Sequence, residues 1–381
     1  MNPNRIRRVI VRTPNWLGDS VMAVPGLRRL RRLFGDAHLA LLCKASIAGL
    51  FEGQGLADEI ILVSGPSPGA FIKDAIKIRR ASWDLAVLLQ NAIGAALFAR
   101  AIGAKYIAGY PTDGRRLLLT APVPLDTEHK TKHQVNYYLG IADYLNQMSG
   151  GVLEPSVSDV SPDLAATPRD RAAAQSLLSA HGLFTNDEST VLHSTTATVT
   201  VASKLSVRGV NPDEHAGPGM RPLVALNPGA TNSRAKQWPP ERFARVADRL
   251  AAQIGSHALI IGTDGDRPVA ERVASLMKSP STVLAGQTSI SQLKGVLSYA
   301  DILVSNDTGA AHLSAALGVP TVVVFGPTEH FSTRPLSDRT AVIRRSVDCS
   351  PCMLRDCPID HRCMTGVGID DVYEAARRLI V

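Results

Sequence analysis

Short apolar segments alternate with amphipathic segments along this 381-residue chain. The chain contains two separate series of such alternating segments. In the first run, β-branched and apolar residues predict strands at 8–12, 38–43, 59–63, 84–89 and 106–109. Helical periodicity appears between several of them, at 21–33, 71–80 and 92–102. Such alternation is typical of a parallel, doubly wound α/β sheet.

The pattern restarts after residue 222. Strands are predicted at 223–227, 257–262, 282–284 and 321–325, with a further strand ending before Asn306, and helices at 240–254, 268–278 and 291–298. The chain is long enough for two domains. Because ligands of such sheets bind at the carboxyl ends of the strands, two facing Rossmann-like units predict an interdomain cleft.

Domain boundaries follow from composition. We predict an N-terminal unit at 1–186 and a C-terminal unit at 222–381 that ends in a cysteine-rich tail. The stretch 187–221 between them is rich in Ser, Thr, Gly and Pro, which predicts a linker or a flexible insertion.

Charge indicates an acidic partner. The net charge is +7 and the pI is about 9.3, which suits nucleic acid, an anionic membrane surface or a phosphorylated substrate, although general solubility is an alternative. Aromatic residues make up only 5%, which argues against a stacking surface for nucleic acid. No signal-peptide pattern or transmembrane run is present, so we expect a cytoplasmic protein that touches the inner membrane from inside.

The turn Asn306-Asp307-Thr308-Gly309 joins a buried strand to a helix. A helix N-terminus at this position binds anions through its free N–H groups, Gly309 allows close approach, and Thr308 offers a hydroxyl. His312, one turn into the helix, either holds a phosphate oxygen or packs. This turn predicts a diphosphate site.

A second loop, Asn227 to Trp238, leaves the same predicted sheet edge and carries Thr231 and Lys236. A lysine beside a helix N-terminus would neutralise charge that grows on a leaving group. The alternative is an exposed loop lysine. The Thr263-Asp-Gly-Asp266 turn follows the next strand; we favour ribose binding by Asp266 or a simple turn over a metal site.

The first strand leads into Thr13 to Met22, where Asp19 lies at the start of a helix. Asp19 is either an N-cap residue or a general base that faces the cleft. Gly18 would let an acceptor come close. His133, with the tyrosines that follow it, belongs to a basic, aromatic patch that would meet an anionic acceptor, and a solvated helix face is the alternative.

Four cysteines crowd the C-terminal tail at Cys349, Cys352, Cys357 and Cys363. Tetrahedral zinc is chemically reasonable for such a set, and His361 is a further candidate ligand. The spacing is not a standard one, so reduced structural thiols are the default interpretation, and we expect no metal at the catalytic site.

Three motifs occur in order: Arg12-x-Pro-Asn-Trp-Leu-Gly-Asp-Ser-Val-Met22, Asn227-Pro-Gly-Ala with Lys236-x-Trp238, and Ser305-Asn-Asp-Thr-Gly-x-x-His312 followed by Phe325-Gly-Pro-Thr328. Together they resemble the lipopolysaccharide heptosyltransferases of glycosyltransferase family 9, and the cysteine-rich tail looks most like the heptosyltransferase II group.

This resemblance implies a GT-B enzyme that transfers heptose from ADP-heptose to the lipopolysaccharide inner core (heptosyl-Kdo-lipid A) with inversion and without a required cofactor. It implies Asp19 as the catalytic base and Lys236 as the diphosphate lysine. The implied donor-side residues are Asp307, Thr308, Gly309, His312 and, less securely, Thr231. The resemblance also implies that the N-terminal unit binds the acceptor and the C-terminal unit the nucleotide sugar. On the acceptor side, the resemblance and the cleft position point to Asn15, Trp16, Gly18 and His133.

Two alternatives stay open on the sequence. One is a GT-B transferase or epimerase that uses another nucleotide sugar. The other is a non-catalytic nucleotide-binding or zinc-binding protein.

Overall fold

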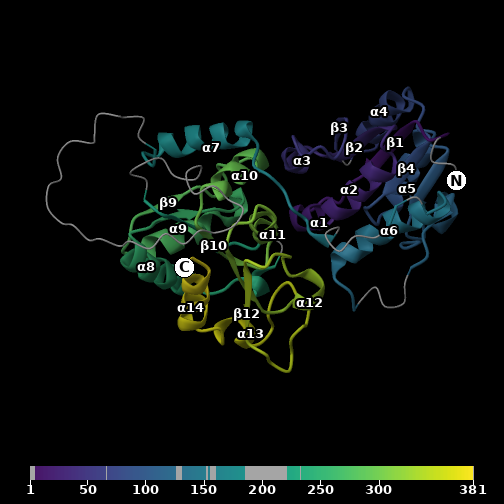
Figure 1. The fold of residues 1–381 in the computed structure, drawn as a ribbon. Coiled ribbons are helices and arrows are strands. Elements are labelled where there is room, and N and C mark those ends of the chain that lie inside the picture. Colours follow the sequence, from purple (N-terminus) through teal and green to yellow (C-terminus); the bar gives the residue numbers. More distant parts are fainter. Residues whose placement is uncertain are drawn as a thin grey trace.

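The computed structural model describes residues 5–65, 67–125, 131–151, 153–154, 160–184, 221–231 and 233–380. The segment predicted as a linker or insertion, 187–221, lies outside these residues except for Arg221. The described chain contains two six-stranded sheets with helices around them (Figure 1).

The first sheet has the strand order β3-β2-β1-β4-β5-β6, and its paired strands are parallel. Its strands are β1 (Arg8–Arg12), β2 (His38–Lys44), β3 (Glu59–Val63), β4 (Leu85–Leu88), β5 (Tyr106–Gly109) and β6 (Ala121–Pro122). The accompanying helices are α1 (Leu17–Met22), α2 (Val24–Leu33), α3 (Ala45–Phe51), α4 (Pro68–Arg79), α5 (Ile93–Ala101) and α6 (Gln134–Met148). Strand order reverses beside β1, because β1 pairs with both β2 and β4.

The second sheet has the order β12-β11-β10-β7-β8-β9 and is also parallel. Its strands are β7 (Leu223–Asn227), β8 (His257–Ile260), β9 (Ser281–Val283), β10 (Ile302–Asn306), β11 (Thr321–Phe325) and β12 (Thr340–Arg344). Its helices are α8 (Pro240–Ile254), α9 (Arg267–Leu276), α10 (Ile290–Ser298), α11 (Gly309–Ala316), α12 (His330–Thr333), α13 (Arg362–Thr365) and α14 (Ile369–Ile380). Here the order reverses between β7 and β10.

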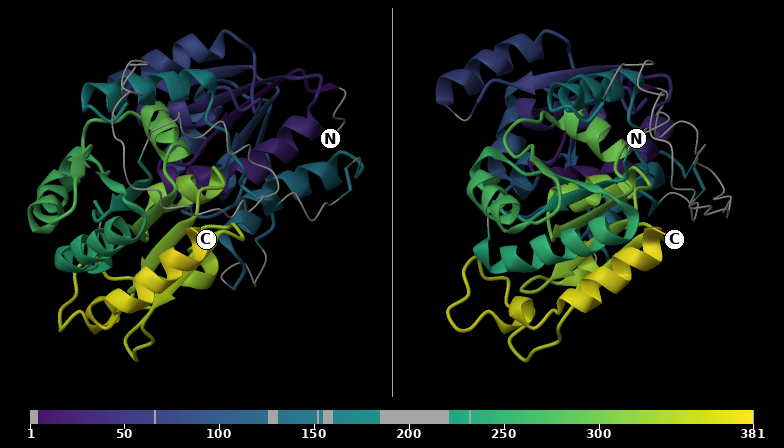
Figure 2. Two further views of the ribbon diagram at one scale, coloured as in Figure 1. Left: turned by 60° about the vertical axis from the view of Figure 1, so that its left-hand side comes forward. Right: turned by 90° about the vertical axis from the view of Figure 1, so that its left-hand side faces the viewer.

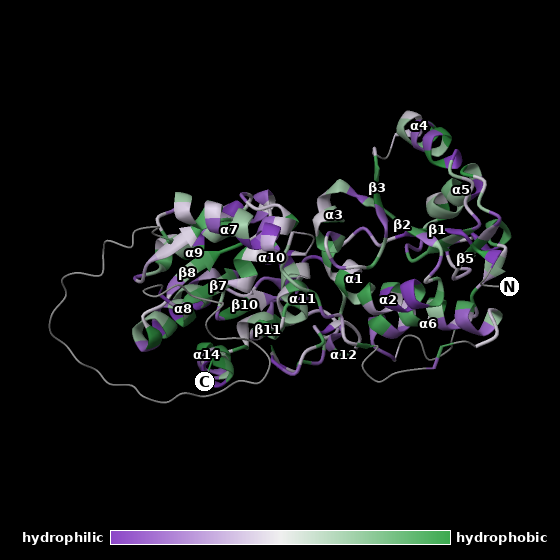
Figure 3. Cartoon of the chain, turned by 45° about the horizontal axis from the view of Figure 1, so that its top comes forward, coloured by the Kyte–Doolittle hydropathy of each residue, from purple (hydrophilic) through white to green (hydrophobic). Residues whose placement is uncertain are grey.

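Apolar patterning explains why these elements form. Every residue of β7, β10 and β11 is buried, as expected for parallel strands that helices cover on both faces. Helix α8 buries Phe243, Val246, Ala247 and Leu250, which lie three or four residues apart on one face, and it ends at Gly255 with a left-handed φ of 68°. Figure 3 shows the same alternation of hydrophobic and hydrophilic residues around the outer helices.

The predicted strands and helices are present in both halves, but one helix start was wrong. The predicted helix at 21–33 begins earlier, at Leu17, and is divided into α1 and α2 at Ala23. Pro25 is one reason, because proline suits the first turn of a new helix and cannot supply a hydrogen bond to a continuing one.

The two units are joined by more than one element. Helix α7 (Pro168–Ala180) precedes the predicted boundary at 186, yet it packs against α10 of the second sheet, as the views in Figures 1 and 2 also show. Lys294 of α10 forms a buried ion pair with Asp170 of α7 (2.9 Å) and also donates to the carbonyl of Glu52 in the first unit. The boundary itself stays a prediction.

Every helix in the described part of the chain is too short or too polar to span a bilayer.

Candidate active site

The catalytic candidates lie where strand order reverses in each sheet, which is where open α/β sheets bind ligands. Asp19 follows β1, Lys236 follows β7, and Asp307 follows β10. Strands β7 and β10 are paired neighbours, so their loops leave the same edge side by side. The structure brings all three residues together.

The two units meet directly at the N-termini of α1 and α11 (Figure 1). A Cβ atom added at Gly309 would lie 2.7 Å from the Cβ of Leu17 and 3.0 Å from the nitrogen of Gly18. A Cβ added at Gly18 would lie 3.1 Å from the His312 ring. Glycine at both positions therefore allows the backbones to approach each other this closely.

Asp19 is not the N-cap of α1; that position belongs to Trp16, and Asp19 lies in the first turn. The Tyr138 hydroxyl donates to its Oδ1 at 3.2 Å. Burial raises the pKa of the Asp19 carboxyl, although the hydrogen bond from Tyr138 and the positive charge of Lys236 lower it in part. A carboxylate with a raised pKa is a better proton acceptor than an ordinary one, and its interaction with Lys236 shows that the two units face each other here.

Lys236 and Asp307 form the positive side of the site. Lys236 Nζ lies 2.7 Å from Asp307 Oδ2, and Thr328 donates to the same oxygen at 2.7 Å. The Asp307 side chain is buried, and that of Lys236 is largely covered, so Lys236 is not an exposed loop lysine. The pair holds the ammonium group beside the free N–H groups at the start of α11.

Two asparagines that the sequence did not single out fix these loops. Asn306 Oδ1 accepts from the backbone N–H of Trp238 (3.0 Å), and Asn306 Nδ2 donates to the carbonyl of Pro228 (2.8 Å). Asn227 Nδ2 donates to Thr308 Oγ1 at 2.7 Å. These bonds tie the loop after β7 to the turn after β10, and an amide side chain is suited to this because it both donates and accepts.

Asp266 and Thr231 lie together in a neighbouring turn. Asp266 Oδ2 accepts from the Thr231 hydroxyl (3.0 Å), the Thr263 hydroxyl (2.7 Å) and the Thr263 N–H (2.9 Å). The carboxyl also fills the space beside Gly229, where a Cβ atom would lie 2.2 Å from its Cγ. Asp266 is thus a buried link between the loops after β7 and β8; its predicted contact with a ribose stays a prediction.

His312 is buried beside Gly18, where α1 and α11 meet. Burial lowers its pKa to about 4, and the charges of His133 and Lys236 act in the same direction, against the charge of Asp307. The ring is therefore neutral at pH 7 and can form a hydrogen bond without adding charge.

The residues predicted on the acceptor side have different surroundings in the structure. Asn15 accepts from the Arg12 guanidinium at 2.7 Å, and Trp16 is 61% exposed. His133 caps α6 through Nδ1, and its Nε2 donates to the carbonyl of Arg334 in the second unit at 2.8 Å. His133 therefore bridges the two units, and its role toward an acceptor stays a prediction.

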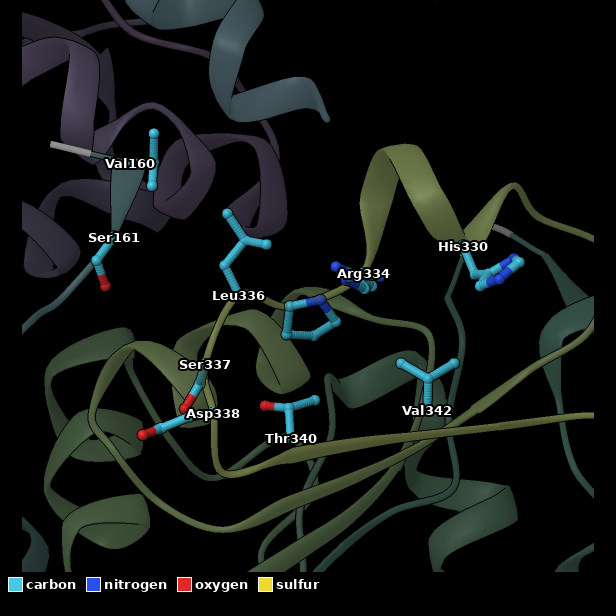
Figure 4. A pocket seen from close by; sticks show the side chains of 10 residues that line it. Val160, Ser161, His330, Arg334, Leu336, Ser337, Asp338, Thr340 and Val342 are labelled. Carbon is cyan, nitrogen blue, oxygen red and sulfur yellow. The ribbon is translucent and has the colours of Figure 1, made fainter. Parts of the chain in front are cut away.

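A cavity of about 620 Å³ begins beside this bridge and does not include Asp19 or Lys236. Figure 4 shows Val160 and Ser161, on the segment that crosses between the units, on one side of it, and Thr340 and Val342 of β12 on the other. Arg334 also lines it.

The four thiols of the tail are free. They lie near one another, since burial and then the other three sulfurs raise the pKa of Cys363. Across the described ranges, no group of three or more His, Cys, Asp or Glu side chains is arranged to hold a metal ion. His361 instead bonds to the carbonyl of Ala235. Uptake of zinc stays a prediction.

A buried carboxylate opposite a lysine and a helix N-terminus suits one displacement reaction. The carboxylate can take a proton from an attacking hydroxyl, while the positive side stabilises a departing phosphate group.

Comparison with known proteins identifies relatives of the whole chain. The chain is 24% identical over 380 residues to lipooligosaccharide heptosyltransferase 2 of Campylobacter jejuni, covering 98% of both chains. A 130-residue stretch, 33% of this chain and 37% of the relative, is 32% identical to lipooligosaccharide heptosyltransferase 2 of Haemophilus influenzae. The structure of ADP-heptose lps heptosyltransferase II from E. coli superposes with a TM-score of 0.76 at 22% identity, covering 98% of both chains, which confirms the GT-B fold.

The model of glycosyltransferase family 9 (heptosyltransferase) matches residues 73–362, most of the chain. The match includes the Lys236 loop, the Asp307 turn and most of the cysteine-rich tail. The expected resemblance is confirmed, and the chain is a member of glycosyltransferase family 9, the heptosyltransferases.

Proposed function

We propose that this protein is an inverting heptosyltransferase that moves heptose from ADP-heptose to the inner core of lipopolysaccharide, with heptosyl-Kdo-lipid A as acceptor. The observation that carries the proposal is the position of the Asp19 carboxylate opposite the Lys236–Asp307 pair, across the contact between Gly18 and Gly309. Membership of the family and the names of the relatives support the donor and the acceptor.

The donor diphosphate lies at the N-terminus of α11. Its oxygens accept from the free N–H groups there, and Lys236 Nζ supplies the positive charge. Asp307 Oδ2 accepts from that ammonium group at 2.7 Å, and the Thr328 hydroxyl donates to the same oxygen at 2.7 Å. Helix N-termini bind phosphate groups in this way because their first N–H groups have no partners within the helix.

The transfer is a single displacement. The acceptor hydroxyl gives its proton to Asp19 while its oxygen bonds to the anomeric carbon, and the bond from that carbon to the β-phosphate oxygen breaks. The electron pair leaves with ADP, whose new charge Lys236 and the helix N-terminus stabilise. Attack opposite the leaving group inverts the anomeric centre, so one base is sufficient.

The acceptor approaches from the first unit, past Asn15, Trp16 and Gly18. An acceptor made of phosphorylated lipid and acidic sugars suits a chain of net charge +7. Its lipid part places the enzyme at the cytoplasmic face of the inner membrane, and the exposed Trp16 indole would lie on the acceptor side.

A direct assay tests the proposal. Purified protein is mixed with ADP-heptose and heptosyl-Kdo-lipid A, and ADP release and the mass of the product are followed. We expect one added heptose, and a loss of at least about a hundredfold in kcat for Asp19→Asn, since a general base contributes roughly 10²–10⁴-fold. Binding of the nucleotide should be retained in this variant. Turnover of a UDP-sugar or GDP-sugar in place of ADP-heptose, or full activity of Asp19→Asn, would contradict the proposal.

A further inference from the structure

The segment 349–363, here called the cysteine loop, follows β12 and leads into α13. Its cysteines suggest a metal site, yet its polar contacts go to the turn that carries Lys236 and to the turn that carries Thr328. These contacts have a function in the active site that the thiols themselves do not explain.

The first set of contacts holds the backbone on the N-terminal side of Lys236. The N–H of Ala235 donates to the carbonyl of Arg355 at 2.9 Å, and the carbonyl of Ala235 accepts from His361 Nε2 at 2.6 Å. Since a carbonyl oxygen can only accept, Nε2 carries the hydrogen. Both backbone groups of Ala235, the residue before Lys236, are therefore fixed by the cysteine loop.

Two side chains of the same turn repeat this pattern. Ser233 Oγ lies 3.3 Å from the carbonyls of Leu354 and Arg355, and Arg234 pairs with Asp356 at 2.7 Å. The Arg234–Asp356 pair is exposed and contributes little, whereas the hydrogen bond between His361 and Ala235 is partly buried.

The second set of contacts holds the turn of Thr328. The N–H of Met353 donates to the carbonyl of Pro327 at 2.8 Å, and Ser350 Oγ donates to the carbonyl of Gly326 at 2.6 Å. A Cβ atom at Gly326 would lie 2.3 Å from the sulfur of Met364, so this contact is close-packed. Lys236 and Thr328, which share one oxygen of Asp307, are thus anchored to one loop.

We propose that the cysteine loop positions Lys236 and Thr328 around Asp307, and that His361 is the positioning residue for Lys236. The hydrogen bond to Ala235 sets the direction of the short turn Arg234–Lys236 and therefore the place of Nζ against the departing diphosphate. A displacement of a catalytic group by about 1 Å can lower a rate by up to about a hundredfold, so this support matters to turnover. The inference rests on the proposed function.

The test compares His361→Leu, which removes the donor, with His361→Gln, which keeps one. His361 has a φ of 58°, and since neither replacement is β-branched, backbone strain is similar in the two variants. We expect His361→Leu to lower kcat for heptose transfer about tenfold with a smaller change in KM for ADP-heptose, and His361→Gln to recover most of the loss.

The decisive readout is a double-mutant cycle with Lys236→Ala. If His361 acts through Lys236, then His361→Leu has no further effect on kcat once Lys236 is absent. An equal loss in both backgrounds would mean that His361 supports the fold in general and would overturn the inference. If His361→Leu does not fold, Ser233→Ala replaces it, with an expected loss of about threefold and the same cycle.

Hydrogen–deuterium exchange separates this inference from the proposed function. In His361→Leu, amides of 233–237 should exchange at least about tenfold faster, whether or not the protein turns over ADP-heptose. Ile359→Ala, an exposed change in the same loop, is the control and should alter neither exchange nor kcat. Unchanged exchange at 233–237 in His361→Leu would refute the positioning role, whereas an inactive wild-type protein would refute only the proposed substrate.

Discussion

A methyl group at Gly309 would lie only 3.0 Å from the backbone nitrogen of Gly18, so the two helices that carry the site meet without a side chain between them. The same methyl group would lie 2.7 Å from the Cβ of Leu17, which is closer than two such carbon atoms approach, so the helices would have to move apart. The distance between Asp19 on one unit and the Lys236–Asp307 pair on the other therefore depends on both glycines.

Replacing Gly309 by alanine should separate the two units and lower kcat by about a hundredfold, because catalytic groups must stay within roughly 1 Å of their productive positions. The affinity for the nucleotide should fall less than kcat, since Lys236 and α11 both belong to the second unit. Steady-state kinetics with nucleotide titration checks this. The control is Gly69→Ala on α4, where no heavy atom of the described chain lies within 4 Å of the new methyl group. Equal kcat values for the two variants would contradict the role of Gly309.

The pH dependence of turnover should report Asp19. Burial raises the pKa of its carboxyl, while the Tyr138 hydroxyl, by donating to the charged form, lowers it. As a base, Asp19 must be deprotonated, so kcat/KM should fall toward acid, with a midpoint above the usual carboxyl range. Tyr138→Phe removes the donor and should move this midpoint to higher pH.

The comparison variant is Tyr373→Phe, which removes a hydroxyl bonded to Gln253 in the second unit. Tyr373→Phe should leave the midpoint of the fall in kcat/KM toward acid unchanged. A shift to lower pH in Tyr138→Phe would show that Asp19 is not the group that titrates.

Lys236→Ala should lower kcat by about 10²–10³-fold, which is the usual cost of removing one group that stabilises charge in a transition state. Its effect on KM for the donor should be smaller, because the helix N-terminus remains. Lys278→Ala, an exposed lysine of the same unit, removes the same charge and should be nearly neutral. Similar rates for the two variants would contradict the assignment of Lys236.

The buried pair of Lys294 and Asp170 should matter to stability and not to chemistry. Burial alone would raise the pKa of Asp170, but hydrogen bonds from Lys294 and Thr167 and the charge of Lys294 lower it overall. Lys294→Met leaves that carboxylate buried without its partner, which should cost about 3–5 kcal/mol of unfolding free energy. Chemical denaturation at pH 7 measures the loss, with Lys278→Met as control. A loss below about 1 kcal/mol would mean that water reaches the pair.

The pH dependence of this pair has a definite sign. Because the folded-state pKa of Asp170 is lowered, its contribution to stability is present above the unfolded-state pKa and is lost as the pH falls through the folded-state value. The difference between wild type and Lys294→Met should therefore shrink in acid.

Much of the fold follows from local patterns. The apolar runs at 223–227 and 321–325 become β7 and β11 with those bounds, because fully buried parallel strands need uninterrupted apolar residues. The loops after β7 and β10 could be placed together, since parallel strands of one sheet end at a common edge, and the loop after β1 was expected to face them across the cleft between the two units. Asp19, Lys236 and Asp307 were found by that reasoning.

The partners of these residues could not be found in the same way. Tyr138 is 119 positions from Asp19, and His361 is 126 positions from Ala235. No periodicity links residues so far apart, and a histidine among cysteines more readily suggests a metal ligand than a support for a lysine. Asn306 was visible in its turn, but its bonds to the loop after β7 depend on how two loops pack.

The support that the cysteine loop gives to Lys236 also sets an order of events during synthesis. Residues 350–361 leave the ribosome long after 233–236, so for that interval the lysine turn has none of the bonds that fix Ala235. A nascent chain interrupted near residue 345 would contain every strand that the structure describes and still lack both hydrogen bonds at Ala235.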